Sequence, residues 1–180
     1  MNRPPELVWR LATWESLGAD ELYAALQLRA EVFVVEQQCA FQDLDGSDPL
    51  ALHLIGRGRA PEVGSGDGAP ADATQHGGEL LAYARCFPAG VKYPEASIGR
   101  IVTRSSVRAT GLGHLLVARA IAAVAQTWGV QPIRIGAQAR LKVFYEQHGF
   151  LDAGCPYMED GIAHLEMRLP SPTRYIGDGR

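Results

Sequence analysis

The sequence predicts a mixed α/β fold, in which helices cover the faces of a mostly antiparallel sheet that contains one parallel crossover. Two observations lead to this prediction. Strand-like runs at Leu50–Ile55, Leu80–Phe87 and Ala96–Thr103 follow one another without a helical pattern between them, as hairpin strands do. A long apolar helical run, Leu112–Trp128, then separates the third strand from the next one, Gln131–Ala137. A strand, a helix and a strand of these lengths close as a right-handed parallel crossover.

The chain before these strands begins with one more strand and an amphipathic helix. Leu7–Ala12 is strand-like, and Asp20 can cap a helix that runs to about Gln38. The apolar positions of that helix recur at helical spacing: Leu22, Leu26 and Phe33. This stripe predicts that the helix covers one face of the sheet.

Three segments are predicted to lie outside regular structure. Phe41–Asp48 is an acidic loop that is rich in turn-forming residues. Residues 57–78 are rich in Gly, Ala and Pro and have little apolar bulk. Because such a segment cannot offset the entropy lost on ordering, we expect a mobile loop there. The tail, 170–180, is expected to be flexible.

Two further elements complete the fold after the crossover. A short helix, Gln138–His148, is followed by Gly149, which suits a left-handed C-cap. The final strand, Ala163–Leu169, alternates apolar and polar residues, with His164 on the polar face. We expect residues 1–180 to form a single domain.

Length and composition exclude several classes of function. The chain has 180 residues, of which 47% are hydrophobic and 21% charged, and its net charge of −3 argues against nucleic-acid binding. Three widely spaced cysteines fit neither a zinc site nor a disulfide framework, and the N-terminus lacks the apolar core of a signal peptide. Arg119 and Gln126 interrupt the apolar helix, which is short for a membrane span. We therefore expect a cytoplasmic protein that has no metal site and does not enter a membrane.

The most informative motif is Arg108-Ala-Thr-Gly-Leu-Gly113, between a strand and the apolar helix. Gly111 and Gly113 let the backbone approach a ligand closely. Thr110 can cap the helix, and Arg108 can bind phosphate. Because a helix N-terminus favours negative charge, the turn predicts a phosphate site; a capped helix start with glycines for tight packing is the alternative. A Rossmann turn would need a third glycine and a Walker loop a Lys-Ser/Thr pair, and neither follows.

Together with a second segment, this turn resembles the GNAT superfamily of acyl-CoA-dependent N-acyltransferases. The family carries Arg/Gln-x-x-Gly-x-Gly/Ala after its fourth strand, as in Arg108–Gly113, and a short helix with a tyrosine that ends in Gly-Phe, as in Leu141–Phe150. Further segments resemble its ElaA-type subgroup: Leu28–Gln37, Gln42–Gly46, Ile135–Ala139 and Glu159–His164. The resemblance covers residues 7–169 without the segment 57–78.

The resemblance implies acyl transfer by direct attack of a primary amine, from a small molecule or a peptide, on acetyl-CoA. It implies that Tyr145 protonates the leaving thiolate, although a core tyrosine is the alternative. Gln138 stands where many members carry an asparagine that contacts the donor. By analogy the protein can form a homodimer. The implied donor-binding residues are Ile101, Val102, Thr103, Arg108, Ala109, Thr110, Gly111, Leu112, Gly113, His114 and Gln138.

The first helix supplies the candidate general base. Arg29 and Glu36 fall on its apolar side, where charge is costly to bury. They lie about 10 Å apart along the helix axis, so each needs another partner or opens on a cleft. We expect Glu36 to act as the base, directly or through water, and Arg29 to help bind the acceptor. An ion pair of Glu36 with Arg85 or Arg100 is the alternative.

The remaining candidates concern the acceptor. Asp43 and Asp45 can give the cleft a negative mouth for a cationic amine, although a solvated turn is the alternative. His164 can reach the acceptor, whereas a strand histidine commonly faces solvent. His53 lies within an apolar strand and is expected to be a core histidine. A non-catalytic acyl-CoA sensor is the second functional hypothesis, and a nicotinamide-dependent reductase is a distant third.

Overall fold

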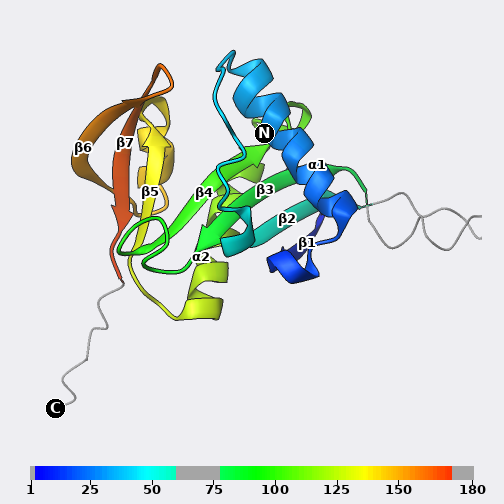
Figure 1. The fold of residues 1–180 in the computed structure, drawn as a ribbon, viewed down its shortest axis with the longest axis horizontal. Coiled ribbons are helices and arrows are strands. Elements are labelled where there is room, and N and C mark those ends of the chain that lie inside the picture. The colour runs from blue at the N-terminus through cyan, green and yellow to red at the C-terminus, as the bar shows by residue number, and fades with distance from the viewer. Residues whose placement is uncertain (1–2, 60–77, 172–180) are drawn as a thin grey trace, which may run out of the picture.

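Seven strands form one mixed sheet in the computed structural model, which describes residues 3–59 and 78–171 (Figure 1). Their order across the sheet is β1-β2-β3-β4-β5-β7-β6. β4 and β5 pair in parallel, and the other neighbouring pairs are antiparallel. The strands are β1 (Leu7–Ala12), β2 (Leu52–Gly58), β3 (Leu80–Phe87), β4 (Ala96–Thr103), β5 (Ile133–Gln138), β6 (Leu151–Glu159) and β7 (Ile162–Leu169). The predicted fold class is therefore confirmed.

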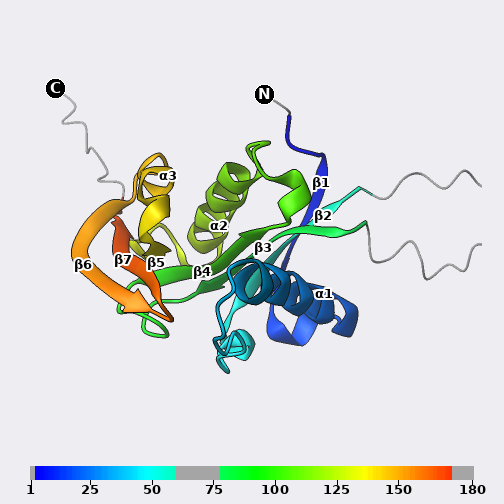
Figure 2. The ribbon, with the colours of Figure 1, turned by 90° about the horizontal axis from the view of Figure 1, so that it is seen from above.

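The α-helices of the described chain cover both faces of this sheet. They are α1 (Ala19–Arg29), α2 (Leu112–Trp128) and α3 (Lys142–Glu146). Figure 2 shows α1 on one face and α2 and α3 on the other. One buried cluster joins α2 and α3 to the sheet, and a second joins α1 to residues such as Tyr83 and Val102. Within the described residues, no helix combines the length and the apolarity that crossing a membrane requires.

α2 is the crossover helix and is fixed by its sequence at both ends. It begins after Gly111 (φ 89°) and ends at Gly129 (φ 81°), both in left-handed conformations that suit glycine. Its buried residues follow the helical period: Leu112, Leu116, Val117, Ala120, Ala123 and Val124. This stripe packs against β3 and β4 and holds the helix N-terminus at the edge of the sheet.

The first helix differs from its prediction in three ways. It begins at Ala19, and Gly18, not Asp20, is the N-cap. It ends at Arg29, where a π-helical segment, Ala30–Glu36, continues the chain. The predicted stripe is only half-buried, since the buried residues are Glu21, Ala25, Leu28, Arg29 and Val32. The pattern failed because two charged side chains lie on the inner face with ion-pair partners, Glu21 with Arg10 and Arg29 with Asp43 and Asp48, which apolar periodicity cannot reveal.

The element boundaries after α1 also shift. Asp48–Leu50 forms a 3-10 turn, and β2 runs on to Gly58, so the predicted loop of 57–78 begins inside a strand. The predicted helix from Gln138 to His148 is divided, because Gln138 still belongs to β5. Gly149 has the predicted left-handed conformation (φ 83°). Residues 60–77 and 172–180, the bulk of the predicted loop and tail, lie outside the described residues.

β6 has no counterpart among the predicted elements. It forms a hairpin with β7 through Asp160 and Gly161, at φ 49° and 79°. It lies at the edge of the sheet, is mostly exposed, and its register shifts between Asp152 and Pro156 (Figure 1). An exposed, irregular edge strand has no apolar alternation, which explains why the pattern missed it.

Candidate functional site

A large cavity opens where the parallel strands separate. β4 and β5 pair at Ala96 with Ile133 and at Ser97 with Arg134, and at no later position of these strands. Beyond this point, the two strands and the segments around them line a cavity of about 1260 Å³. The peptide groups of β4 that face β5 there have no ladder partner in the described chain. They are therefore available to an extended ligand.

β4 is bulged beside the cavity. The register between β3 and β4 shifts between Tyr83 and Arg85, and Arg100 adopts a left-handed conformation (φ 49°). A non-glycine residue in this region costs about 1–3 kcal/mol, which its surroundings must offset. The Arg100 guanidinium donates to the Asp43 carboxylate at 2.7 Å and thereby anchors the bulge to the acidic loop. The predicted donor-binding residues of β4, Ile101, Val102 and Thr103, all line the cavity.

The glycine turn lies at the same cavity, next to the N-terminus of α2. Gly111 and Ala109 have left-handed conformations (φ 89° and 60°), and nothing lies within 4 Å of a Cβ added at Gly111. The residues of the predicted turn that line the cavity are Arg108, Ala109, Gly111, Gly113 and His114. The unpaired N–H groups of the first helical turn therefore adjoin the cavity, which suits an anion.

Two residues of the turn do not line the cavity. Thr110 was expected to cap α2, but its hydroxyl donates to the Val107 carbonyl at 2.7 Å and closes the preceding turn instead. Leu112 is buried in the core beneath α2. Both side chains are engaged in contacts within the protein, so only the backbone of Thr110 and Leu112 could contact the donor.

Arg108 is already engaged in this structure. Its guanidinium contacts the Glu36 carboxylate at 2.7 Å and donates to the Thr103 carbonyl at 3.2 Å. Glu36 thus lines the cavity as predicted, but it pairs with Arg108 and not with Arg85 or Arg100. This contact links the end of the π-helical segment to the phosphate turn. A second contact links that segment to β5, because the Gln138 amide donates to the Gln37 side chain at 2.9 Å.

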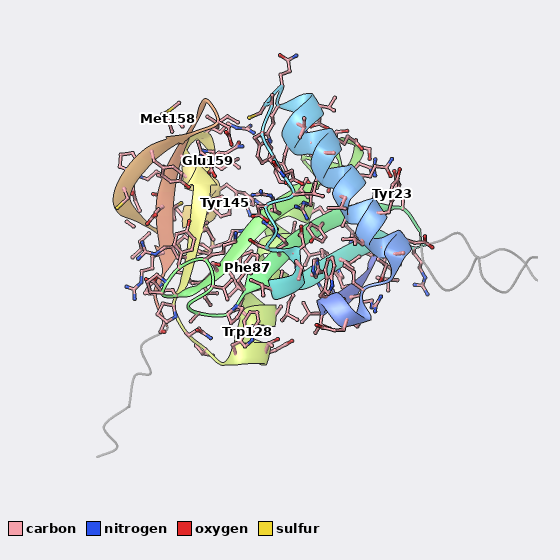
Figure 3. The ribbon with its side chains drawn as sticks, viewed as in Figure 1. Tyr23, Phe87, Trp128, Tyr145, Met158 and Glu159 are labelled. Atoms are coloured by element: carbon pink, nitrogen blue, oxygen red, sulfur yellow. The ribbon has the colours of Figure 1, made fainter. Side chains whose placement is uncertain are left out.

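Tyr145 projects from α3 into the cavity (Figure 3). Its ring packs edge-on against Phe144 and Phe150, with centroids 5.0 and 5.9 Å apart. Among the described residues, no hydrogen bond or charge contributes to the shift of its pKa, and burial is the sole cause. Burial raises the pKa of Tyr145 to about 12. The phenol therefore keeps its proton at neutral pH and is present in the protonated form that a general acid needs.

The acidic loop does not form the predicted negative mouth. Arg29 is fully buried and donates to Asp43 and Asp48 at 2.9 and 2.6 Å. Neither Arg29 nor Asp43 lines the cavity, whereas Asp45 does. The network joins three carboxylates to four cations, namely Asp43, Asp45, Asp48, Arg29, Arg85, Lys92 and Arg100. The prediction was wrong because the loop folds inward, where the arginines neutralise its charges.

The two strand histidines differ in their surroundings. His53 is fully buried; its Nε2–H donates to the Asp48 carbonyl at 3.0 Å, and its Nδ1 accepts the Tyr83 hydroxyl at 2.7 Å. Burial is the main cause that lowers the pKa of His53, so it is a neutral core histidine, as predicted. His164 lines the cavity beside Tyr157, with only 12% of its side chain exposed, and does not face bulk solvent.

Sequence analysis missed several residues of the cavity wall. Tyr93 and Tyr157 line it, and a Cβ added at Gly136 would lie 2.4 Å from the Tyr157 hydroxyl and 3.4 Å from that of Tyr93. Gly136 was the available signal, because a glycine inside a strand often marks a close approach of another group. A side chain at this position of β5 would therefore displace the Tyr157 hydroxyl from its place in the cavity wall.

A mixed sheet that opens at its parallel pair, with a glycine turn at the N-terminus of the crossover helix, defines an acyl-CoA-dependent acyltransferase. The chain belongs to the GNAT acetyltransferase family, whose domain model matches residues 73–171. The expected ElaA-type relationship is confirmed: Escherichia coli ElaA is 35% identical over 88% of this chain and 94% of its own length.

Solved structures show the same relationship. The crystal structure of an acyl-CoA N-acyltransferase from Pseudomonas aeruginosa is 37% identical, with a TM-score of 0.76 over 91% of this chain and 99% of that one. The crystal structure of Escherichia coli ElaA is 32% identical, with a TM-score of 0.73 over 91% of this chain and 99% of that one.

Proposed function

We propose that this protein transfers the acetyl group of acetyl-CoA to a primary amine. The observation that carries the proposal is the opening between β4 and β5, because unpaired strand groups, a helix N-terminus and a buried phenol all meet one cavity. The unpaired strand groups suit the pantetheine amides of an acyl-CoA, and the helix N-terminus suits its pyrophosphate. The buried phenol suits the sulfur that departs during transfer. The residues present therefore fit this donor.

On the donor side, the turn supplies two means of binding an anion. The amides at the start of α2 and the guanidinium of Arg108 hold the pyrophosphate, and Ile101 to Thr103 pair with the pantetheine amides. His114 and Gln138 border the same space. Because Arg108 contacts Glu36 in the free protein, a pyrophosphate competes with that carboxylate for the guanidinium.

Tyr145 acts as the general acid in this proposal. The amine attacks the thioester carbonyl, the carbon–sulfur bond breaks, and Tyr145 gives its proton to the thiolate. Its pKa of about 12 means that the phenol holds this proton until it is needed. The phenolate then recovers a proton from solvent. A reaction that starts from an ammonium ion releases one proton for each amide formed.

The acceptor is proposed as a primary amine of no further defined class. The contact network of the acidic loop removes the predicted reason for the cleft mouth to attract a cationic amine by its negative charge. A homodimer and a cytoplasmic location stay predictions from the sequence.

Calorimetric and thiol-release measurements test the proposal. Acetyl-CoA should raise Tm by mass action, and thiol release should require an amine, assayed with spermidine, Nα-acetyl-lysine, phenethylamine and a dipeptide amide. Tyr145→Phe should bind CoA with unchanged Kd and release thiol at least 10²-fold more slowly, as expected for a lost general acid. No change of Tm at millimolar acetyl-CoA would refute the function. Binding without turnover across the panel would instead favour the sensor.

A further inference from the structure

The cavity is lined from both faces of the sheet. Tyr145 belongs to the buried cluster under α2, together with Leu165 and Met167 of β7. Because side chains alternate along a strand, His164 lies on the opposite face, toward α1. Yet Tyr145 and His164 line the same cavity. Because the sheet is open between β4 and β5, Tyr145 on one face and His164 on the other can contact reactants in the same cavity.

The hydrogen bonding of His164 fixes which ring nitrogen is basic. Its Nδ1 lies 2.9 Å from the Ile162 carbonyl oxygen, and a carbonyl can only accept. In the neutral ring the proton therefore resides on Nδ1, and Nε2 carries the lone pair. The ring is stacked on Tyr157 with centroids 5.5 Å apart, so it cannot turn freely. An oriented imidazole with a free Nε2 is what general-base catalysis requires.

The groups that face this imidazole suit a cationic product of proton transfer. The Glu159 carboxylate lies 3.9 Å from Nε2, and Tyr157 is the other titratable group in contact. The cross-strand neighbours of His164 are Tyr157 on β6 and Gln138 on β5. A carboxylate at this distance stabilises the imidazolium without occupying Nε2 by a direct hydrogen bond.

Two other acidic groups of the cavity are poorer candidates for the base. Glu36 contacts Arg108 at 2.7 Å in the free protein, which places its carboxylate at the phosphate end of the cavity, on the donor side. Asp45 accepts hydrogen bonds from Arg85 and Lys92 at 2.8 and 3.1 Å. Although burial alone would raise the pKa of Asp45, the bonds and charge of Arg85 lower it far below its ordinary value. A carboxylate stabilised in this way accepts a proton weakly.

We propose that His164 is the general base that deprotonates the acceptor amine, an assignment that rests on the proposed acetyl transfer. Nε2 takes one proton from the ammonium ion and becomes an imidazolium facing Glu159. The freed nitrogen lone pair forms the bond to the thioester carbon. As the carbon–sulfur bond breaks, the nitrogen loses its second proton to solvent and the sulfur takes one from Tyr145. His164 finally returns its proton to solvent.

Two variants of His164 test the base role. His164→Asn can keep the hydrogen bond to Ile162 through its amide, whereas His164→Ala leaves a space beside Tyr157 for an added imidazole. Both should lower kcat/KM by about 10²–10⁴-fold at pH 8 while CoA binding is retained. Added imidazoles should restore turnover of His164→Ala, and the restored rate should rise with the pKa of the imidazole, because a better base removes the proton faster.

Controls separate this role from structural damage. Glu166→Gln changes the same face of β7 two residues away, at a position outside the cavity lining, and should stay within about twofold of wild type. If wild-type kcat/KM falls toward acid pH, Glu36→Gln should keep that acidic limb and His164→Asn should lose it. Measurement of Tm confirms that each variant is folded.

The outcomes divide clearly. Wild-type turnover together with undiminished kcat/KM in folded His164→Asn refutes the base role and leaves the acetyl transfer standing. Loss of the acidic limb in Glu36→Gln but not in His164→Asn assigns the base to Glu36 instead. A rescue that is independent of the added imidazole's pKa also overturns the proposal. If wild type binds CoA and acetylates none of the four amines, the proposed function itself fails.

Discussion

Asp48 holds two buried arginines, so neutralising it should destabilise the protein by a predictable amount. Its Oδ1 accepts from Arg29 at 2.6 Å and from Arg85 at 3.0 Å, and both arginines are almost completely buried. Hydrogen bonds to charged groups contribute about 1.5–3 kcal/mol each, roughly twice a neutral bond. Asp48→Asn keeps the acceptor and loses the charge, which should cost about 1.5–3 kcal/mol. Asp48→Ala should cost about 3–5 kcal/mol, as for one partner removed from a buried pair.

The pH dependence of this loss has a defined sign. Burial alone would raise the pKa of Asp48, but the hydrogen bond and charge of Arg29, with the charge of Arg85, lower it overall. A carboxyl with a lowered folded pKa stabilises fully above its unfolded pKa of about 3.9 and loses that contribution as the pH falls through the folded pKa. The difference in the free energy of unfolding between wild type and Asp48→Asn should therefore have its full value at pH 7 and become smaller below about pH 4.

Urea unfolding at several pH values measures both quantities. With a slope of about 2 kcal/mol per molar, the midpoint of Asp48→Asn should fall by about 0.7–1.5 M at pH 7. Asp152→Asn is the matched control, because its ion pair with Lys142 is exposed and should leave the midpoint unchanged. The reasoning would be refuted if Asp48→Asn had the same urea midpoint as wild type, or if the difference between the two midpoints stayed constant down to pH 3.

Three further predictions concern the cavity. The Ser97 hydroxyl is buried and has no hydrogen-bond partner within residues 3–59 and 78–171, so Ser97→Ala should raise the free energy of unfolding by about 1 kcal/mol, and a lower urea midpoint would contradict this. Gly136→Ala places a Cβ 2.4 Å from the Tyr157 hydroxyl and should destabilise by about 1–3 kcal/mol; adding Tyr157→Phe should recover much of that loss in the same assay. Glu36→Gln releases Arg108 from a partly exposed pair worth at most about 1 kcal/mol, so calorimetry should show CoA binding up to about fivefold tighter, and weaker binding would argue against the competition.

The central part of the fold was predictable because its signals are local. The apolar period and glycine boundaries of α2, and the predominantly apolar run of β3, are visible in the sequence itself. The conformation of the glycine turn was predictable for the same reason, since Gly111 has a φ of 89°, which favours glycine. β6 lacked such a pattern, although Asp160-Gly161 is a hairpin signal that was available.

The acceptor side was less predictable because its properties depend on distant partners. Whether Asp43 faces solvent or a buried arginine is decided by Arg29 and Arg100, which lie 14 and 57 residues away. His164 likewise reads as an exposed strand residue until β6 is placed beside it and Tyr157 covers its ring. Periodicity assigns a residue to a face, and only the tertiary structure shows what covers that face.

The brief pairing of β4 with β5 leaves both strands with unpaired peptide groups in the middle of the sheet. Two residue pairs join the half formed by β1 to β4 to the half formed by β5 to β7. The central strands of a sheet ordinarily exchange their amide hydrogens most slowly. Here each strand beside the opening behaves as an edge on one side, and edges invite a further strand. Because this edge lies inside a cavity, it is sheltered from other proteins, and the amides beside the opening should exchange their hydrogens faster than those of the fully paired strands.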